Sequence, residues 1–241
     1  MENSIYLAIS RQLALRNNMD ITANNIANMN TTGFRAQHML FNEYIEDPKG
    51  ADDELSFVLD KGQYQITTAG PMQLTGNQLD VAISGPAYIG ITGPGGQQFY
   101  TRAGAFQMDA AGIITDASGN PVSDAGGGQI IVPAGSTEIK IDEQGNVSNQ
   151  DGQIAQIMMV EFENLQMLEA QGNNLYATDQ AGIPAENSVM KQGVLEGSNV
   201  QPVQEMTNMI DTLRTYQSVQ NLLSEENDRL RDAIDKLTQK N

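Results

Sequence analysis

The stretch MTNMIDTLRTYQSVQNLLSEENDRLRDAIDKL, residues 206–237, repeats apolar side chains at alternating steps of three and four residues. This spacing is typical of one face of an α-helix, and a seven-residue repeat of this length is typical of a coiled-coil seam. We therefore predict a long C-terminal helix that packs against another helix. Its two rows are Met209, Tyr216, Leu223, Leu230 and Leu237, and Met206, Leu213, Gln220, Asn227 and Ile234.

The N-terminal residues 5–29, IYLAISRQLALRNNMDITANNIANM, show the same repeat. We predict a helix from about Ser4 to Met29, and a second one that begins at Val203 after a break over residues 193–202. Neither helix can bury its apolar rows alone, so its partner is either the other end of the chain or a neighbouring copy. The N-terminal rows are Ile5, Gln12, Met19 and Ile26, and Ala8, Leu15, Thr22 and Met29.

Polar side chains lie inside and around these rows. Gln12, Gln220 and Asn227 either specify the register of the helices or are tolerated on a wet seam. Side-chain amides can bond several neighbours at once, which favours a subunit contact, although a frayed helix end is the plainer alternative. The asparagines in question are Asn17, Asn18, Asn24, Asn25, Asn28 and Asn30.

Between the two ends, from about Leu55 to Ala181, short apolar runs alternate with glycine turns. Regular turns of this kind indicate antiparallel sheets rather than βαβ units. Residues 157–162 form the longest strand candidate. We predict an α+β fold with discontinuous terminal coiled-coil helices and a central, mainly antiparallel β domain. The expected segments are residues 1–35 (helix), 36–54 (connector), 55–192 (β domain) and 193–241 (helix).

Composition excludes several classes of function. Thirteen basic and thirty acidic residues give a formal net charge of -17, so we expect no nucleic-acid partner, because phosphate binding needs a basic face. No apolar run approaches the roughly 20 residues of a membrane span. The first residues lack a basic region and an uninterrupted apolar region, so we expect no cleaved Sec signal peptide.

We expect no catalytic, cofactor-binding or metal site. The chain has no cysteine and one histidine, His38, so zinc or another transition metal lacks its usual ligands. The glycine runs at 93–96 and 126–128 lack the Gly-Lys-Ser/Thr of a phosphate loop. The acids Asp47, Asp52, Asp53 and Glu54 lack EF-hand spacing. Glycan cleavage by paired carboxylates stays an alternative, but no pattern singles out a pair.

Three stretches resemble one family, the bacterial flagellar rod and hook proteins. They are residues 14–35 (ALRNNMDITANNIANMNTTGFR), residues 79–85 (LDVAISG) with 100–106 (YTRAGAF), and residues 194–207 (VLEGSNVQPVQEMT). They occur in the expected order and cover nearly the whole chain. Residues 130–148 and 194–198 are more similar to proximal-rod members than to distal-rod ones. Residues 86–89, Pro-Ala-Tyr-Ile, depart from the Gly-Phe-Phe common in relatives.

The resemblance implies a structural subunit of the proximal rod, without enzymatic activity. Its terminal helices would form the assembly core of a hollow helical structure that transmits torque, with the β domain outside. It also implies export through the flagellar type III apparatus, assembly in the periplasm, and contacts with other rod proteins and copies of itself. A distal-rod or hook-type subunit and a secreted adhesin-like β protein on a coiled-coil stalk remain alternatives. The predicted contact residues are Leu15, Met19, Ile26, Asn24, Asn25, Asn28, Met206, Met209, Leu213, Tyr216 and Leu223.

Overall fold

The computed structural model describes residues 2–46 and 55–238 and divides the chain into two compact units. The first, here called the terminal unit, combines the chain up to Ala27, Gln37–Ile66 and the chain from Gln201. The second, the β unit, combines Asn28–Ala36 with Thr67–Val200. The fold is thus a mixture of helices and antiparallel strands, as predicted.

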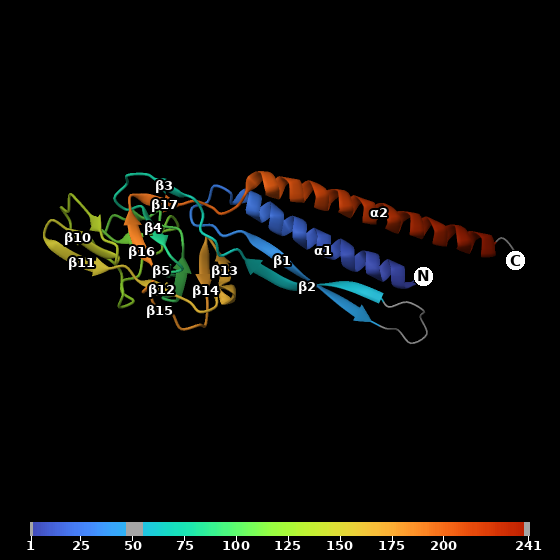
Figure 1. Ribbon diagram of the computed structural model, residues 1–241, viewed down its shortest axis with the longest axis horizontal. Helices are drawn as coiled ribbons and strands as arrows, with labels where there is room; N and C mark the ends of the chain where they lie inside the picture. Colours follow the sequence, from blue (N-terminus) through green and yellow to red (C-terminus); the bar gives the residue numbers. More distant parts are fainter. Residues whose placement is uncertain (1, 47–54, 239–241) are drawn as a thin grey trace. The chain divides into compact units, whose positions relative to one another are not determined.

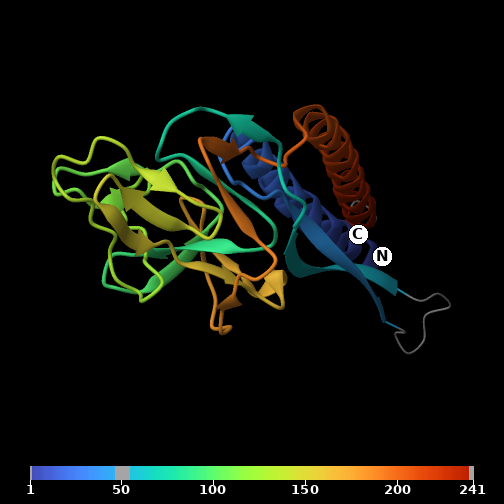
Figure 2. The ribbon, with the colours of Figure 1, turned by 60° about the vertical axis from the view of Figure 1, so that its left-hand side comes forward.

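The terminal unit consists of two helices and one hairpin. Helix α1 (Glu2–Ala27) contacts helix α2 (Pro202–Thr238) as well as both strands of the hairpin, β1 (Gln37–Glu46) and β2 (Leu55–Gln65). The helices run antiparallel, so that the start of α1 and the end of α2 lie at the same end of the pair (Figures 1 and 2). Helix α1 is therefore covered on two sides, which accounts for its short buried side chains Ala8, Ala14 and Thr22.

The β unit is built from short strands, all of whose pairings are antiparallel. They are β3 (Met72–Leu74), β4 (Val81–Ser84), β5 (Tyr88–Thr92), β6 (Gln98–Thr101), β7 (Gln107–Met108), β8 (Ile114–Thr115), β9 (Lys140–Ile141), β10 (Asn146–Asn149), β11 (Gly152–Gln156), β12 (Met159–Glu161), β13 (Glu169–Gly172), β14 (Leu175–Ala177), β15 (Ile183–Pro184), β16 (Val189–Gln192) and β17 (Val194–Glu196), with a 3-10 helix η1 (Leu165–Met167).

The largest sheet of the β unit has six strands in the order β13-β14-β6-β5-β12-β15. Strands β9 to β11 form a three-stranded sheet, and β16-β4, β17-β3 and β7-β8 are two-stranded (Figure 2). Strands β4 and β5 are buried almost throughout, and their Val81, Ile83, Ile89 and Ile91 lie in one apolar core with side chains from the neighbouring strands. On each strand these branched side chains are two residues apart and lie on the same face, and their burial stabilises the core.

Four turns of the β unit share one design, Asp-x-x-Gly. In each, one aspartate oxygen accepts hydrogen bonds from the backbone N–H groups two and four residues further on. The glycine has a positive φ, which side chains with a Cβ rarely adopt. The turns begin at Asp109, Asp116, Asp124 and Asp142. Some of the acidic residues of the chain therefore stabilise tight turns.

The stability of the turn that begins at Asp142 is expected to depend on pH. Partial burial alone would raise the pKa of Asp142, but hydrogen bonds from the side chain and backbone of Asn146 and the N–H groups of Gln144 and Gly145 outweigh it and hold the pKa below its ordinary value. We expect Asp142→Ala to lower the free energy of unfolding at pH 7 by about 1 kcal/mol. Because the pKa is lowered on folding, this stabilisation is fully present above the unfolded-state pKa near 4 and is lost as the pH falls through the lower folded-state pKa, so the difference should be smaller at about pH 3 than at pH 7. Urea unfolding at both pH values measures this.

An exposed aspartate of the same sheet, Asp151, provides the control. Its side chain makes no hydrogen bond of this kind among those found, so Asp151→Ala should change stability by less than about 0.5 kcal/mol at either pH. Equal losses in the two variants would contradict the assigned role of Asp142.

The structure differs from the predicted segments at their boundaries. The prediction of a connector at residues 36–54 is wrong for its first part, because Gln37–Glu46 form strand β1. Residues 47–54 lie outside the described residues. Strand β1 pairs antiparallel with β2, which continues through Gly62 and belongs with the helices rather than with the β domain. The β unit instead extends to Val200. Helix α1 ends at Ala27, before the asparagine-rich turn, and β2, not residues 157–162, is the longest strand.

Candidate assembly surface

Two hydrogen bonds join the helices across their seam. Asn18 Nδ2 donates to Thr212 Oγ1 at 3.3 Å, and Asn25 Nδ2 donates to Glu205 Oε2 at 3.4 Å. The two bonds are seven residues apart on both helices, so a polar pair recurs once per heptad. They fix an antiparallel register in which, for example, Ala14 stands at the level of Tyr216. Thr212 and Glu205 are both buried.

The predicted contact residues fall into four groups. Met206 and Leu213 are exposed on α2, and Asn24 is exposed on α1. Asn25 is only 1 % exposed, and its amide bonds partners within its own chain. Asn28 lies in the β unit, where its Oδ1 accepts from Thr31 Oγ1. Six are half-buried in the terminal unit: Leu15, Met19, Ile26, Met209, Tyr216 and Leu223.

Each helix carries a row of exposed apolar side chains besides the seam. On α1 the row is Tyr6, Ile9 and Leu13, which are 64 %, 42 % and 57 % exposed. On α2 it is Val203, Met206, Ile210 and Leu213, of which Val203 is 80 % exposed. Steps of three and four residues place each row on one helix face. A contiguous apolar face of this kind on a soluble unit marks an interaction surface.

The two rows do not lie at the same level of the helix pair. In the register of the cross-helix hydrogen bonds, Leu13 stands at the level of Gln217, whereas Ile210 stands at the level of Asp20. Neither row can therefore cover the other within one chain.

Asn25 joins three elements of the terminal unit. Its side-chain amide donates to the carbonyl of Gln37 at 2.8 Å and its oxygen accepts from the N–H of Gln37 at 3.0 Å, as a neighbouring strand would. The same amide contacts Glu205, in the first turn of α2, whose second carboxylate oxygen lies 3.9 Å from Nε2 of His38. We call Asn25, Gln37, His38 and Glu205 the junction, because α1, β1 and α2 meet there.

The β unit contains a second polar cluster, centred on Glu196 of β17. Arg102 donates from Nε and Nη2 to Glu196 Oε2 at 3.0 and 2.6 Å. Arg35 Nη2 lies 2.7 Å from Glu196 Oε1, which also accepts from the N–H of Gly70 at 3.1 Å. All three charged side chains are at most 4 % exposed. Their charges are compensated mainly by one another, so each depends on the others to remain buried.

Both arginines make further bonds to backbone carbonyls. Arg102 donates to the carbonyls of Ile83, Gly85 and Ala87, and Arg35 to that of Thr68. Burial lowers the pKa of Arg35, and the nearby Glu196 carboxylate acts against that shift. Through Glu196, these bonds link Arg35 and Thr68 to Arg102, which holds strand β4 and the turn that follows it.

The segments next to the two helices are held together inside the β unit. The N–H of Gly33 donates to the carbonyl of Glu196 at 2.7 Å, and the N–H of Ala36 to Oδ1 of Asn199 at 2.7 Å. Asn199 Nδ2 also reaches the carbonyl of Thr68, close to where the hairpin chain enters. These bonds hold residues 33–36, Thr68 and Asn199 together within the β unit.

Gly33 allows a close approach between its own backbone and that of Arg102. Its φ is +68°, and a Cβ would lie 2.4 Å from the backbone carbon of Arg102. We expect Gly33→Ala to lower the free energy of unfolding of the β unit by about 3 kcal/mol, from backbone strain and steric overlap together. Gly135 has a similar φ of +92° but open space around it, so Gly135→Ala should cost only about 1 kcal/mol. If urea unfolding gave equal losses of unfolding free energy for the two variants, the short distance between Gly33 and Arg102 would not contribute to the effect.

Comparison with known proteins adds an independent observation. Residues 5–35 match the family described as "Flagella basal body rod protein", residues 82–149 the "Flagellar hook protein FlgE/F/G D1 domain", and residues 191–236 the "Flagellar basal body rod FlgEFG protein C-terminal". The chain is 37 % identical to the flagellar basal-body rod protein FlgF of Caulobacter vibrioides, with 98 % of each chain covered. It is 32 % identical to FlgF of Rhizobium meliloti over 98 % of each chain, and 31 % identical to FlgG of Bacillus subtilis over 97 % and 98 %.

The chain belongs to the flagellar basal-body rod proteins. It is a structural subunit of the rod, and the FlgF-like character inferred from its sequence is confirmed. The Glu196 cluster brings together the three distant stretches that carry the resemblance, since Arg35, Arg102 and Glu196 come one from each. The sequence did not lead us to connect these three residues. Each of the three stretches contains a charged residue, which was the one signal that could have indicated the cluster.

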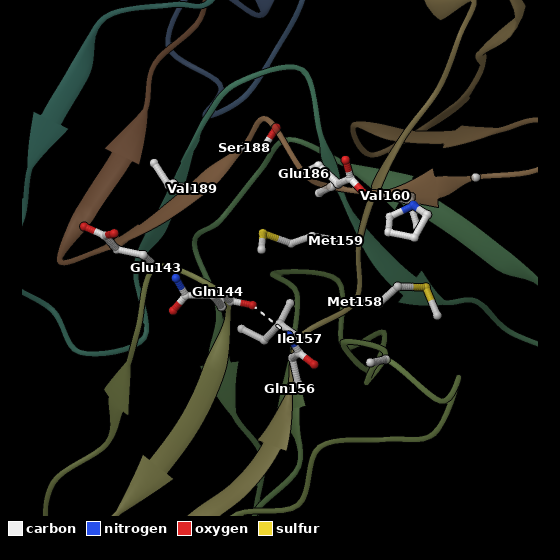
Figure 3. A pocket seen from close by; sticks show the side chains of 14 residues that line it. Glu143, Gln144, Gln156, Ile157, Met158, Met159, Val160, Glu186, Ser188 and Val189 are labelled. Atoms are coloured by element: carbon white, nitrogen blue, oxygen red, sulfur yellow. Dashed lines mark hydrogen bonds between the residues drawn. The ribbon is translucent and has the colours of Figure 1, made fainter.

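The β unit of this rod protein also has an open pocket of about 510 Å³. In Figure 3, Met159 lies between the side chains of Glu143 and Glu186, which come from two sides of the pocket. Both glutamates are exposed, so neither has the apolar surroundings that keep a carboxylic acid protonated for glycan cleavage. His38 is not among the lining residues.

The described residues include no cluster of three or more His, Cys, Asp or Glu suited to a metal ion. Among them, no helix is both apolar enough and long enough to cross a lipid bilayer.

Proposed function

We propose that this rod subunit polymerises through the terminal unit, in the periplasm, into the torque-transmitting axial structure. The observation that carries the proposal is the pair of exposed apolar rows on α1 and α2. Their positions at different levels mean that they find partners only on other subunits, either copies of this chain or other rod proteins. The β unit then forms the outer layer, and the protein acts without catalysis.

A contact between two different faces fits growth of a rod. When the α2 row of one subunit packs against the α1 row of the next, the same contact can repeat without closing, which builds a helical filament. The half-buried residues of the seam, Met19 and Tyr216 among them, pair the helices in a coiled coil within each subunit. Asn24, whose side chain is exposed on α1, is included in the proposed contact with a neighbouring subunit.

Export is proposed to use the flagellar type III apparatus, as the family resemblance implies. The helix pair would cross that apparatus unfolded and form afterwards, because α1 and α2 gain most of their stability from packing rather than from helix propensity.

Mass spectrometry of purified, hook-stripped basal bodies tests the location. We expect peptides of this chain to be recovered in fixed proportion to other rod proteins. Absence from that fraction, with abundance elsewhere in the cell envelope, would overturn the proposal and favour an adhesin-like protein on a stalk.

A further inference from the structure

The junction contains a buried carboxylate that lacks a permanent counter-charge among the described side chains. Glu205 is 6 % exposed at its side chain, and its contacts there are the uncharged amide of Asn25 at 3.4 Å and the imidazole of His38 at 3.9 Å. Burying a charged carboxylate is costly unless a cation pairs with it. The Glu205 carboxylate thus faces the amide of Asn25 on α1 and the imidazole of His38 on β1, and the imidazole can gain a proton.

His38 can take up that proton from solvent. Its side chain is 33 % exposed, and its ring stacks beside that of Tyr64, its cross-strand partner on β2, with centroids 5.9 Å apart. Among the described residues packed around the ring, Glu205 and Tyr64 are the titratable ones. Histidine is the side chain whose charge normally changes between pH 5 and 8. Protonation would place a cation next to Glu205 and complete the pair.

We infer that His38 and Glu205 form an ion pair when His38 is protonated, and that this pair holds the first turn of α2 against α1 and the hairpin. The imidazolium attracts the carboxylate, which keeps Glu205 in reach of Asn25, and Asn25 in turn keeps its two bonds to Gln37. The junction is therefore tighter in mild acid and looser above neutral pH. Because it acts on the helix pair to which assembly was assigned, this inference deepens the proposed function: the pH of the compartment adjusts how firmly the assembly helices are held.

The N–H of Gln37 reports on the junction directly, since it donates to Asn25 Oδ1. We expect its hydrogen-exchange protection in the full chain, corrected for the intrinsic rate, to be about threefold higher at pH 5.5 than at pH 7.5, the size typical of a partly exposed ion pair. In His38→Gln, and separately in Glu205→Gln, protection should be the same at both pH values. The double variant should behave as either single one, because both remove the same interaction.

A matched control is Glu226→Gln, which changes a carboxylate farther along α2 that pairs with Arg229 and should leave the pH response of Gln37 intact. Equal pH responses in the native chain and in His38→Gln would overturn the inference, as would a native chain without a response. The exchange measurement uses unassembled protein. A negative result there would leave the assembly proposal unaffected, and a negative result for assembly would leave the pH response of the junction unaffected.

Discussion

Replacing Glu196 with alanine is expected to lower the melting temperature of the β unit by roughly 10 °C. The substitution leaves Arg35 and Arg102 buried at no more than 4 % exposure without their shared carboxylate. Removing one partner from a buried ion cluster costs about 3–5 kcal/mol, and each kcal/mol lowers the melting temperature of a domain this size by about 2–4 °C. Differential scanning calorimetry of the full chain measures the shift.

Two variants show whether the charge is responsible. Glu196→Gln keeps only one of the two acceptor oxygens, either the one that faces Arg102 or the one that faces Arg35 and Gly70, and removes the negative charge, so it should give an intermediate loss. Glu163→Ala removes an exposed carboxylate of the same unit and should shift the melting temperature by less than about 2 °C. A loss for Glu163→Ala as large as that for Glu196→Ala would contradict the account of the cluster.

Replacing Leu213 with aspartate is expected to reduce incorporation into basal bodies more than tenfold. Leu213 is 44 % exposed in the single chain, so the variant should fold, but its carboxylate would be buried at the proposed contact with a neighbour. Burying an unpaired charge there costs several kcal/mol, which exceeds the 1.4 kcal/mol of a tenfold change. Quantitative mass spectrometry of basal bodies, with circular dichroism of the purified chain, separates lost assembly from lost folding.

Ser218→Asp is the matched control, because it adds the same charge to the same helix at an exposed position away from the apolar row. We expect it to be incorporated like the native chain. Normal incorporation of Leu213→Asp would show that the α2 row is not the contact surface.

The helices were predictable because a seven-residue repeat is a local pattern. The prediction extended α1 to Met29, whereas the helix stops at Ala27, because residues 28–36 fold with the β unit. The seven-residue rows alone could not say which side of each helix faces its partner. Met206 and Met209 belong to the two predicted rows of one seam, yet Met209 is half-buried while Met206 is exposed.

The hairpin and the Glu196 cluster illustrate why longer-range features were missed. Residues 37–46 alternate only weakly, and their strand partner begins only at Leu55, so the pairing is not a local signal. The ion cluster joins residues up to 161 positions apart, and only the folded chain brings them together. Asn25 was predicted as a subunit contact together with Asn24 and Asn28, whereas its amide bonds Gln37 and Glu205 of its own chain, which no repeat connects to it.

Disulfide trapping in assembled rods tests the central claim most directly, since the chain has no native cysteine. Leu13→Cys combined with Ile210→Cys places one cysteine in each exposed row, about seven residues or 10 Å apart in level within one chain, too far for an intrachain bond. Asn18→Cys with Thr212→Cys, whose native side chains touch at 3.3 Å, should close within a chain. The account predicts a ladder of linked subunits from the first pair and monomers from the second. Monomers alone from the first pair in fully incorporated rods would contradict it.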